Sequence, residues 1–258
     1  SAAPGTLFSR YIGVVDSVDI FNYQIGIDAA GQLFLRYFYD TGTGIESTNE
    51  ILKTSMPVID DLADYKWHHV AVSLVRMFPT VTNPSLPDYH KFKVLFMVDG
   101  VDVSDPTDLT PVLYLPAKDV VPTYMASATA GQNNGAPEAF TADYFEIRLW
   151  NYGRSFEEIE EGYSAPLAGT ERNLAAYFRF DDGPEGKWGD HLNPTVENFA
   201  AQFRQDWFRD WINAATLDPT NASIIPVANG GPYGDTFVDS DGDGIPDWWE
   251  QLHFGNLT

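Results

Sequence analysis

The sequence contains no cysteine and few basic residues. Its 258 residues include 37 aspartates and glutamates but only 15 lysines and arginines, and the formal net charge is −22 at pH 7. The absence of cysteine excludes disulfides, cysteine-ligated zinc and thiol catalysis. The acidic excess, which is spread along the chain, makes nucleic acid and anionic membranes poor partners. No apolar run approaches the roughly 20 residues that cross a bilayer, so we expect no membrane insertion.

Short strand-like runs fill the chain from Leu7 to about Phe180. Hydrophobic residues make up 44% of the sequence and aromatic residues 14%, enough for a real core. Many runs alternate apolar with polar residues, which is typical of antiparallel strands in a two-layer sandwich. The predicted strands cover residues 7–12, 23–27, 32–39, 67–75, 92–98, 144–150 and 175–180.

Local signals predict two hairpin turns and one helix. Residues 28–31 (Asp-Ala-Ala-Gly) separate two of the predicted strands, and Asp99-Gly100 is the strongest hairpin signal in the chain. Ser155, with Glu158 three residues later, forms a capping box. It predicts a helix that continues through about Tyr163.

Four motifs resemble the laminin-G-like (concanavalin A-like lectin/glucanase) domains of bacterial surface proteins. They are Trp-His-His-Val-Ala-Val at 67–72, Val-Leu-Phe-Met-Val-Asp-Gly at 94–100, Glu-Ile-Arg-Leu-Trp-Asn at 146–151 and Leu-Ala-Ala-Tyr-Phe-Arg-Phe-Asp-Asp at 174–182. The resemblance implies an all-β, antiparallel jelly-roll sandwich over residues 1–182, used for glycan binding, adhesion or spacing. It also implies a second calcium site, for which Asp102 or Asp105 is available, although their spacing does not establish one.

The chain departs from that family in two places. The family's extra amino-terminal strand is not found before Leu7, which leaves an unpaired sheet edge and invites pairing with another chain or segment. The stretch from Arg76 to Phe92 contains three prolines and is longer than the usual turn between those strands.

Residues 183–235 differ in composition and are predicted to be a helical spacer followed by a linker. Phe199, Phe203, Trp207 and Trp211 recur every four residues, which predicts an aromatic stripe along one helix face. Such a stripe either packs against the sandwich or, if exposed, forms a docking surface.

The last segment, residues 236–258, carries a calcium-loop pattern. Carboxylates at positions 1, 3, 5, 9 and 12 of a loop, with glycine at position 6 and a backbone carbonyl at position 7, suit the six to eight oxygen ligands of Ca²⁺. These positions are filled by Asp239, Asp241, Asp243, Gly244, Ile245, Asp247 and Glu250. The arrangement resembles dockerin and thrombospondin type 3 loops, with one exit helix behind an EF-hand-type loop.

Enzymatic signals are weak. Asp143 and Glu146 lie three apart on a predicted strand, on opposite faces, and cannot flank one glycosidic bond. The neighbours His68 and His69 likewise point to opposite faces, so no zinc site is predicted.

We therefore expect a non-enzymatic, calcium-binding module of a large secreted or surface-displayed bacterial protein. Its expected role is adhesion or head-to-tail self-assembly, with other copies or neighbouring modules as partners. The alternative is a lectin-like module that binds glycans. Candidate sugar-binding residues are Tyr37, Tyr39, Tyr89, Tyr124, Asn133 and Asn134.

Overall fold

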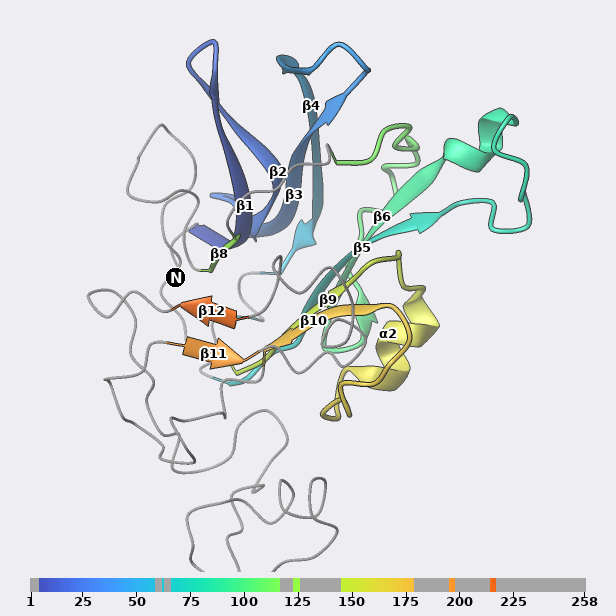
Figure 1. The fold of residues 1–258 in the computed structure, drawn as a ribbon. Coiled ribbons are helices and arrows are strands. Elements are labelled where there is room, and N and C mark those ends of the chain that lie inside the picture. Colours follow the sequence, from blue (N-terminus) through green and yellow to red (C-terminus); the bar gives the residue numbers. More distant parts are fainter. Residues whose placement is uncertain are drawn as a thin grey trace, which may run out of the picture. The chain divides into compact units, whose positions relative to one another are not determined.

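The computed structural model describes residues 5–58, 62, 66–116, 123–125, 145–178, 195–197 and 214–216. In this part the chain is built mainly of antiparallel β-strands with little helix (Figure 1), which confirms the predicted β-rich class. Two compact units are formed, one by residues 1–142 with 153–161 and the other by residues 143–152 with 162–258. No helix in the described ranges is long and apolar enough to span a membrane.

Among the described residues, the largest sheet has five strands in the order β4-β3-β2-β1-β8, and each neighbouring pair is antiparallel (Figure 1). Hairpins connect β1 to β2, β2 to β3 and β3 to β4, so most of the sheet follows the chain order. The strands are β1 (Gly5–Val15), β2 (Val18–Ile27), β3 (Gln32–Asp40), β4 (Ile45–Pro57) and β8 (Thr123–Met125).

The turn between β2 and β3 confirms the hairpin predicted at residues 28–31. One carboxylate oxygen of Asp28 accepts the backbone N–H groups of Ala30, at 2.8 Å, and of Gln32, at 3.0 Å. Gly31 has a φ of 75°, a conformation that glycine adopts without steric cost. The aspartate and the glycine together therefore set this turn.

A second sheet has three strands in the order β5-β6-β7: β5 (Val70–Arg76), β6 (Phe92–Val98) and β7 (Val101–Asp102). The predicted Asp99-Gly100 hairpin joins the last two, since Val98 pairs with Val101. Both turn residues have positive φ, 50° and 77°, as a type I′ turn requires. Between β5 and β6 the chain makes a long excursion that includes the 3-10 helix η1 (Pro87–His90).

Residues of both sheets meet in one buried apolar cluster. In β3 the members occur at every second position, because alternate side chains of a strand point to the same face. The second sheet contributes alternate residues of β6 in the same way. The buried members are Ile27, Leu33, Leu35, Tyr37, Val58, Val94, Phe96, Val98 and Val112.

Helix α2 (Phe156–Gly162) packs on the three-stranded sheet, and its start confirms the predicted capping box. Glu158 Oε2 accepts the Ser155 N–H at 2.8 Å, and Ser155 Oγ accepts the Glu158 N–H at 3.3 Å. Ile159 is buried with Leu95 and Met97 of β6. The helix therefore covers part of this sheet with a single apolar turn.

In its described residues, the second unit contains two short antiparallel pairs, β9 (Ile147–Trp150) with β10 (Leu174–Phe178) and β11 (Thr195–Glu197) with β12 (Ala214–Thr216). Around the first pair, Leu174 and Tyr177 are buried against Trp150 and Leu167. The predicted aromatic stripe at residues 199–211 lies between β11 and β12, outside the described residues.

Strand β4 was not among the predicted strands. Its sequence, Ile-Glu-Ser-Thr-Asn-Glu-Ile-Leu-Lys-Thr-Ser-Met-Pro, is mostly polar, and partly buried residues alternate with exposed ones. In the described part of the chain, β4 forms one edge of the five-stranded sheet. On the side of β4 that faces away from β3, the described residues form a backbone hydrogen bond only near the end of the strand. There the Met56 N–H donates to the Val103 carbonyl at 2.9 Å.

Candidate functional site

The residues predicted to bind calcium lie outside the described residues. These are Asp239, Asp241, Asp243, Ile245, Asp247 and Glu250. Within the described ranges no group of three or more His, Asp or Glu side chains is close enough to hold a metal ion. The calcium site therefore stays a prediction from the loop pattern.

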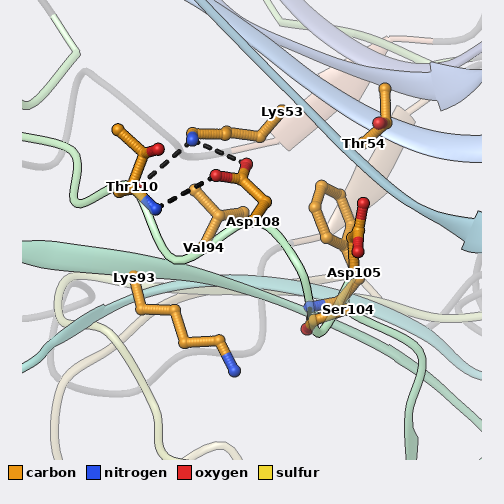
Figure 2. A pocket seen from close by; sticks show the side chains of 9 residues that line it. Lys53, Thr54, Lys93, Val94, Ser104, Asp105, Asp108 and Thr110 are labelled. Atoms are coloured by element: carbon orange, nitrogen blue, oxygen red, sulfur yellow. Dashed lines mark hydrogen bonds and ion pairs between the residues drawn. The ribbon is translucent and has the colours of Figure 1, made fainter.

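A small hollow lies between the end of β4, strand β6 and the loop that follows β7 (Figure 2). It is lined by Lys53, Thr54, Lys93, Val94, Phe96, Ser104, Asp105, Asp108 and Thr110. Its volume is about 20 Å³, which is room for about one water molecule.

An ion pair occupies one wall of this hollow. Figure 2 shows the Lys53 ammonium directed at the Asp108 carboxylate, and the Nζ–Oδ2 distance is 2.7 Å. Lys53 Nζ also donates to the Thr110 carbonyl at 3.3 Å. The hydrogen bond from Lys53 is the largest cause that lowers the pKa of Asp108, although partial burial opposes it. This pairing ties β4 to the loop after β7.

Asp105, one of the two candidate ligands for a second calcium ion, lies on the same loop as Asp108. Its Oδ1 accepts hydrogen bonds from the Thr107 hydroxyl, at 2.7 Å, and from the Thr107 N–H, at 2.8 Å. These bonds lower the pKa of Asp105. One carboxylate oxygen is therefore engaged in shaping the turn.

Tyr37 and Tyr39 have different environments. Tyr37 is fully buried in the shared core, and its hydroxyl donates to the Tyr114 carbonyl at 2.6 Å, while burial raises its pKa well above the ordinary value. Tyr37 is therefore a core residue, and its prediction as a sugar-binding residue is wrong. Tyr39 stacks on the exposed Tyr114 ring, with the ring centres 4.4 Å apart and the planes at 4°.

The remaining candidate sugar-binding residues do not converge on one described site. Tyr89 lies in the excursion between β5 and β6, where the Arg76 guanidinium sits 3.8 Å from its ring centre. Tyr124 is part of β8, and Asn133 and Asn134 lie outside the described residues.

Glu146 and the histidine pair are engaged in local contacts. Glu146 accepts a hydrogen bond from Arg148, and both side chains are less than 10% exposed. His68 Nδ1 lies 2.7 Å from Asp99 Oδ2, while Asp99 Oδ1 accepts the His69 N–H at 2.8 Å. Asp99 therefore links the type I′ turn to the start of β5.

The long segment between β5 and β6 was not predicted from the sequence to be a functional surface. We call residues 76–93 the β5–β6 insert. It combines Arg76, Lys91 and Lys93 with the exposed side chains of Met77, Phe78 and Leu86. The available signal was a local excess of basic residues in a strongly acidic chain.

No protein-family model matches this chain, and no curated protein or solved structure matches it at a significant level. The laminin-G-like resemblance therefore rests on the four sequence motifs.

Proposed function

We propose that this chain is a non-catalytic calcium-binding module of a large secreted or surface-displayed bacterial protein. Its body is a laminin-G-like jelly-roll sandwich, its tail is an EF-hand-type calcium loop, and it acts in adhesion or head-to-tail self-assembly. The observation that carries the proposal is the loop from Asp239 to Glu250, in which every ligand position carries a residue suited to Ca²⁺.

Electrostatics explains why a cation matters there. Five carboxylates within one short loop repel each other, so the ordered loop is unfavourable until a divalent cation neutralises them. Ca²⁺ binding then contributes directly to the stability of the tail, by mass action. Extracellular modules bind Ca²⁺ with dissociation constants of about 10⁻⁴ to 10⁻³ M.

The β-rich part of the chain also supports the proposal, because it is suited to be the rigid body that carries such a tail. Its two larger sheets share an apolar core, and Asp and Gly residues set their hairpin turns. A body of this kind is suited to a connector, because it holds its surfaces in fixed positions.

Calorimetry of the purified chain tests the calcium site. We expect Ca²⁺ uptake with a 1:1 stoichiometry, and we expect Asp241→Asn/Glu250→Gln to abolish it. Glu46→Gln, at an exposed position of β4, is the control and should bind as the parent does. An absence of binding heat, or a melting temperature indifferent to Ca²⁺, would contradict the proposal.

The assembly role has its own readout. Excess EGTA should disperse assembled particles, since the tail would lose its neutralising cation. Particles that keep their size in the chelator would count against calcium-dependent assembly while leaving the calcium site itself in place.

Carbohydrate binding is a second candidate, favoured by the Tyr39–Tyr114 stack. Tyr114 is 46% exposed, so one face of an aromatic pair is presented towards solvent, and sugar rings pack on such faces. A glycan array tests it. Reproducible binding that is lost in Tyr114→Ala but kept in Tyr89→Ala supports the lectin function, and a blank array argues against it.

A further inference from the structure

The β5–β6 insert has the opposite charge character from the rest of the chain. Residues 76–93 contain three basic residues, Arg76, Lys91 and Lys93, and one acidic residue, Asp88, so the formal charge of the insert is +2 in a chain of −22. Lys91 Nζ lies 2.7 Å from Asp88 Oδ1 and Lys93 Nζ lies 3.9 Å from Asp102 Oδ2, but the two lysine side chains remain 34% and 48% exposed. Such a basic patch on an acidic protein attracts acidic surfaces and steers their approach.

The insert also exposes apolar side chains beside its cations. Met77 is 39% exposed, Phe78 is 40% exposed and Leu86 is 49% exposed. Lys91 Nζ lies 5.8 Å from the Phe78 ring centre, so charge and apolar surface are adjacent. Apolar area next to positive charge is typical of an interaction surface.

The insert forms hydrogen bonds between its own segments. The Met77 N–H donates to the Lys91 carbonyl at 2.9 Å and closes its base. Near its tip, a His90 ring nitrogen lies 2.9 Å from the Pro84 carbonyl oxygen. A preorganised surface loses little conformational entropy on binding, which favours association.

Helix α2 supplies the complementary surface. Glu157, Glu160 and Glu161 are exposed, and within the described residues none of them forms an ion pair. The last turn contains no basic residue. Glu160 and Glu161 lie toward the negative end of the helix dipole, an unfavourable arrangement that a cationic partner relieves, whereas Glu157 lies in the first turn.

We propose that the β5–β6 insert of one copy binds the acidic face of helix α2 on a second copy of this chain. Every copy carries both halves of the contact, and the two halves are different surfaces. Such a contact can repeat head to tail and build an open chain of copies, or it can close into a ring, of which the reciprocal two-fold dimer is the smallest. This inference rests on the proposed self-assembly and names the surfaces that carry it.

Charge reversal with complementation tests the contact. The full chain is followed by sedimentation velocity over a concentration series, with Ca²⁺ present, at low and high salt. Lys91→Glu/Lys93→Glu and, separately, Glu157→Lys/Glu160→Lys/Glu161→Lys should each weaken self-association by about tenfold or more, and high salt should weaken the parent. An equimolar mixture of the two variants should associate again. The unchanged basic insert of the α2 variant can bind the unchanged acidic helix of the insert variant.

Matched substitutions outside the two surfaces serve as controls. Arg172→Glu changes the net charge by −2, as each of the two lysine substitutions does, and Leu109→Ser removes an exposed leucine as Leu86→Ser does. We expect Leu86→Ser to weaken association and both controls to behave as the parent. Circular dichroism and melting curves identify any variant that has lost its fold, and the mixing experiment then uses the milder Lys91→Gln/Lys93→Gln.

Several results would overturn the inference. They are a parent chain that stays monomeric, insert and α2 variants that associate as the parent does, or a mixture that fails to complement. Heparin binding by a monomeric parent, lost in Lys91→Glu/Lys93→Glu, would assign the insert to an anionic polymer instead. Association that needs the insert but persists in EGTA supports this contact and contradicts calcium-dependent assembly. Association that is lost in EGTA but is unaffected by the insert variants supports calcium-dependent assembly and contradicts this contact.

Discussion

Replacement of Gly153 by alanine tests how closely the turn before α2 approaches strand β5. A Cβ added to Gly153 would overlap the Leu74 carbonyl group, which is backbone and cannot swing aside. Because non-bonded atoms pack at about 3.5 Å, the turn would have to move away from β5 by roughly 1–2 Å. Only glycine allows the observed approach.

The cost of that movement has two parts. Ser73 Oγ donates to the Arg154 carbonyl at 2.8 Å across the gap, and losing this largely buried bond costs about 1 kcal/mol. The shift also withdraws Phe156 and Ile159 from their contacts on the three-stranded sheet, at a further cost of about 1–2 kcal/mol. We therefore expect Gly153→Ala to destabilise the chain by about 2–3 kcal/mol and to lower its melting temperature by roughly 5–10 °C.

Urea unfolding followed by circular dichroism at fixed Ca²⁺ measures the effect. The exposed Asn151→Ala, two residues earlier, is the control and should stay within about 0.5 kcal/mol of the parent. Ser73→Ala should cost about 1 kcal/mol alone and less when combined with Gly153→Ala, since both changes remove the same bond. A Gly153→Ala chain as stable as the parent would refute the reasoning.

Three further changes have defined outcomes. Ser17 has a φ of 66° in the β1–β2 turn, so Ser17→Gly should stabilise by about 0.5–1 kcal/mol; a lower melting temperature would contradict this. Ser155→Ala removes the α2 cap and should cost about 1 kcal/mol in urea unfolding, whereas an unchanged midpoint would mean that the cap is unimportant. Asp108→Asn should cost about 0.5–1 kcal/mol at neutral pH. Because the folded-state pKa of Asp108 is lowered, the ion pair is fully formed above the ordinary carboxyl pKa of about 4, and the difference from the parent should fade as the pH drops below it. A difference that is independent of pH would exclude the ion pair as its cause.

Predictions from adjacent residues agree well with the described structure. The turn at Asp28, the Asp99-Gly100 hairpin and the Ser155 capping box all form with the expected hydrogen bonds or backbone angles. Strand β6 has the predicted bounds, and the other predicted strands differ mainly at their ends. In each case the structure depends on a few neighbouring side chains.

Predictions that depend on distant partners agree less well. Strand β4 was missed because its polar sequence is stabilised by pairing with β3, as expected of an edge strand. Among the candidate sites, the calcium loop is recognisable from spacing alone, whereas the β5–β6 insert was visible in sequence as an unusually long connection with a local excess of basic residues. Its exposed apolar groups could not be told from buried ones without the fold.

The sequence by itself determined the acidic character, the lack of disulfides, the antiparallel β class, the turns and the calcium-loop pattern, since all of these follow from composition or from short-range spacing. The tertiary structure alone decided that Tyr37 is buried, with its hydroxyl bonded to the carbonyl of Tyr114 77 residues away, and that position 153, which lies against strand β5, must be glycine. It also decided that the insert presents cations and apolar groups together. These features are set by packing between segments far apart in the chain, which no local pattern encodes.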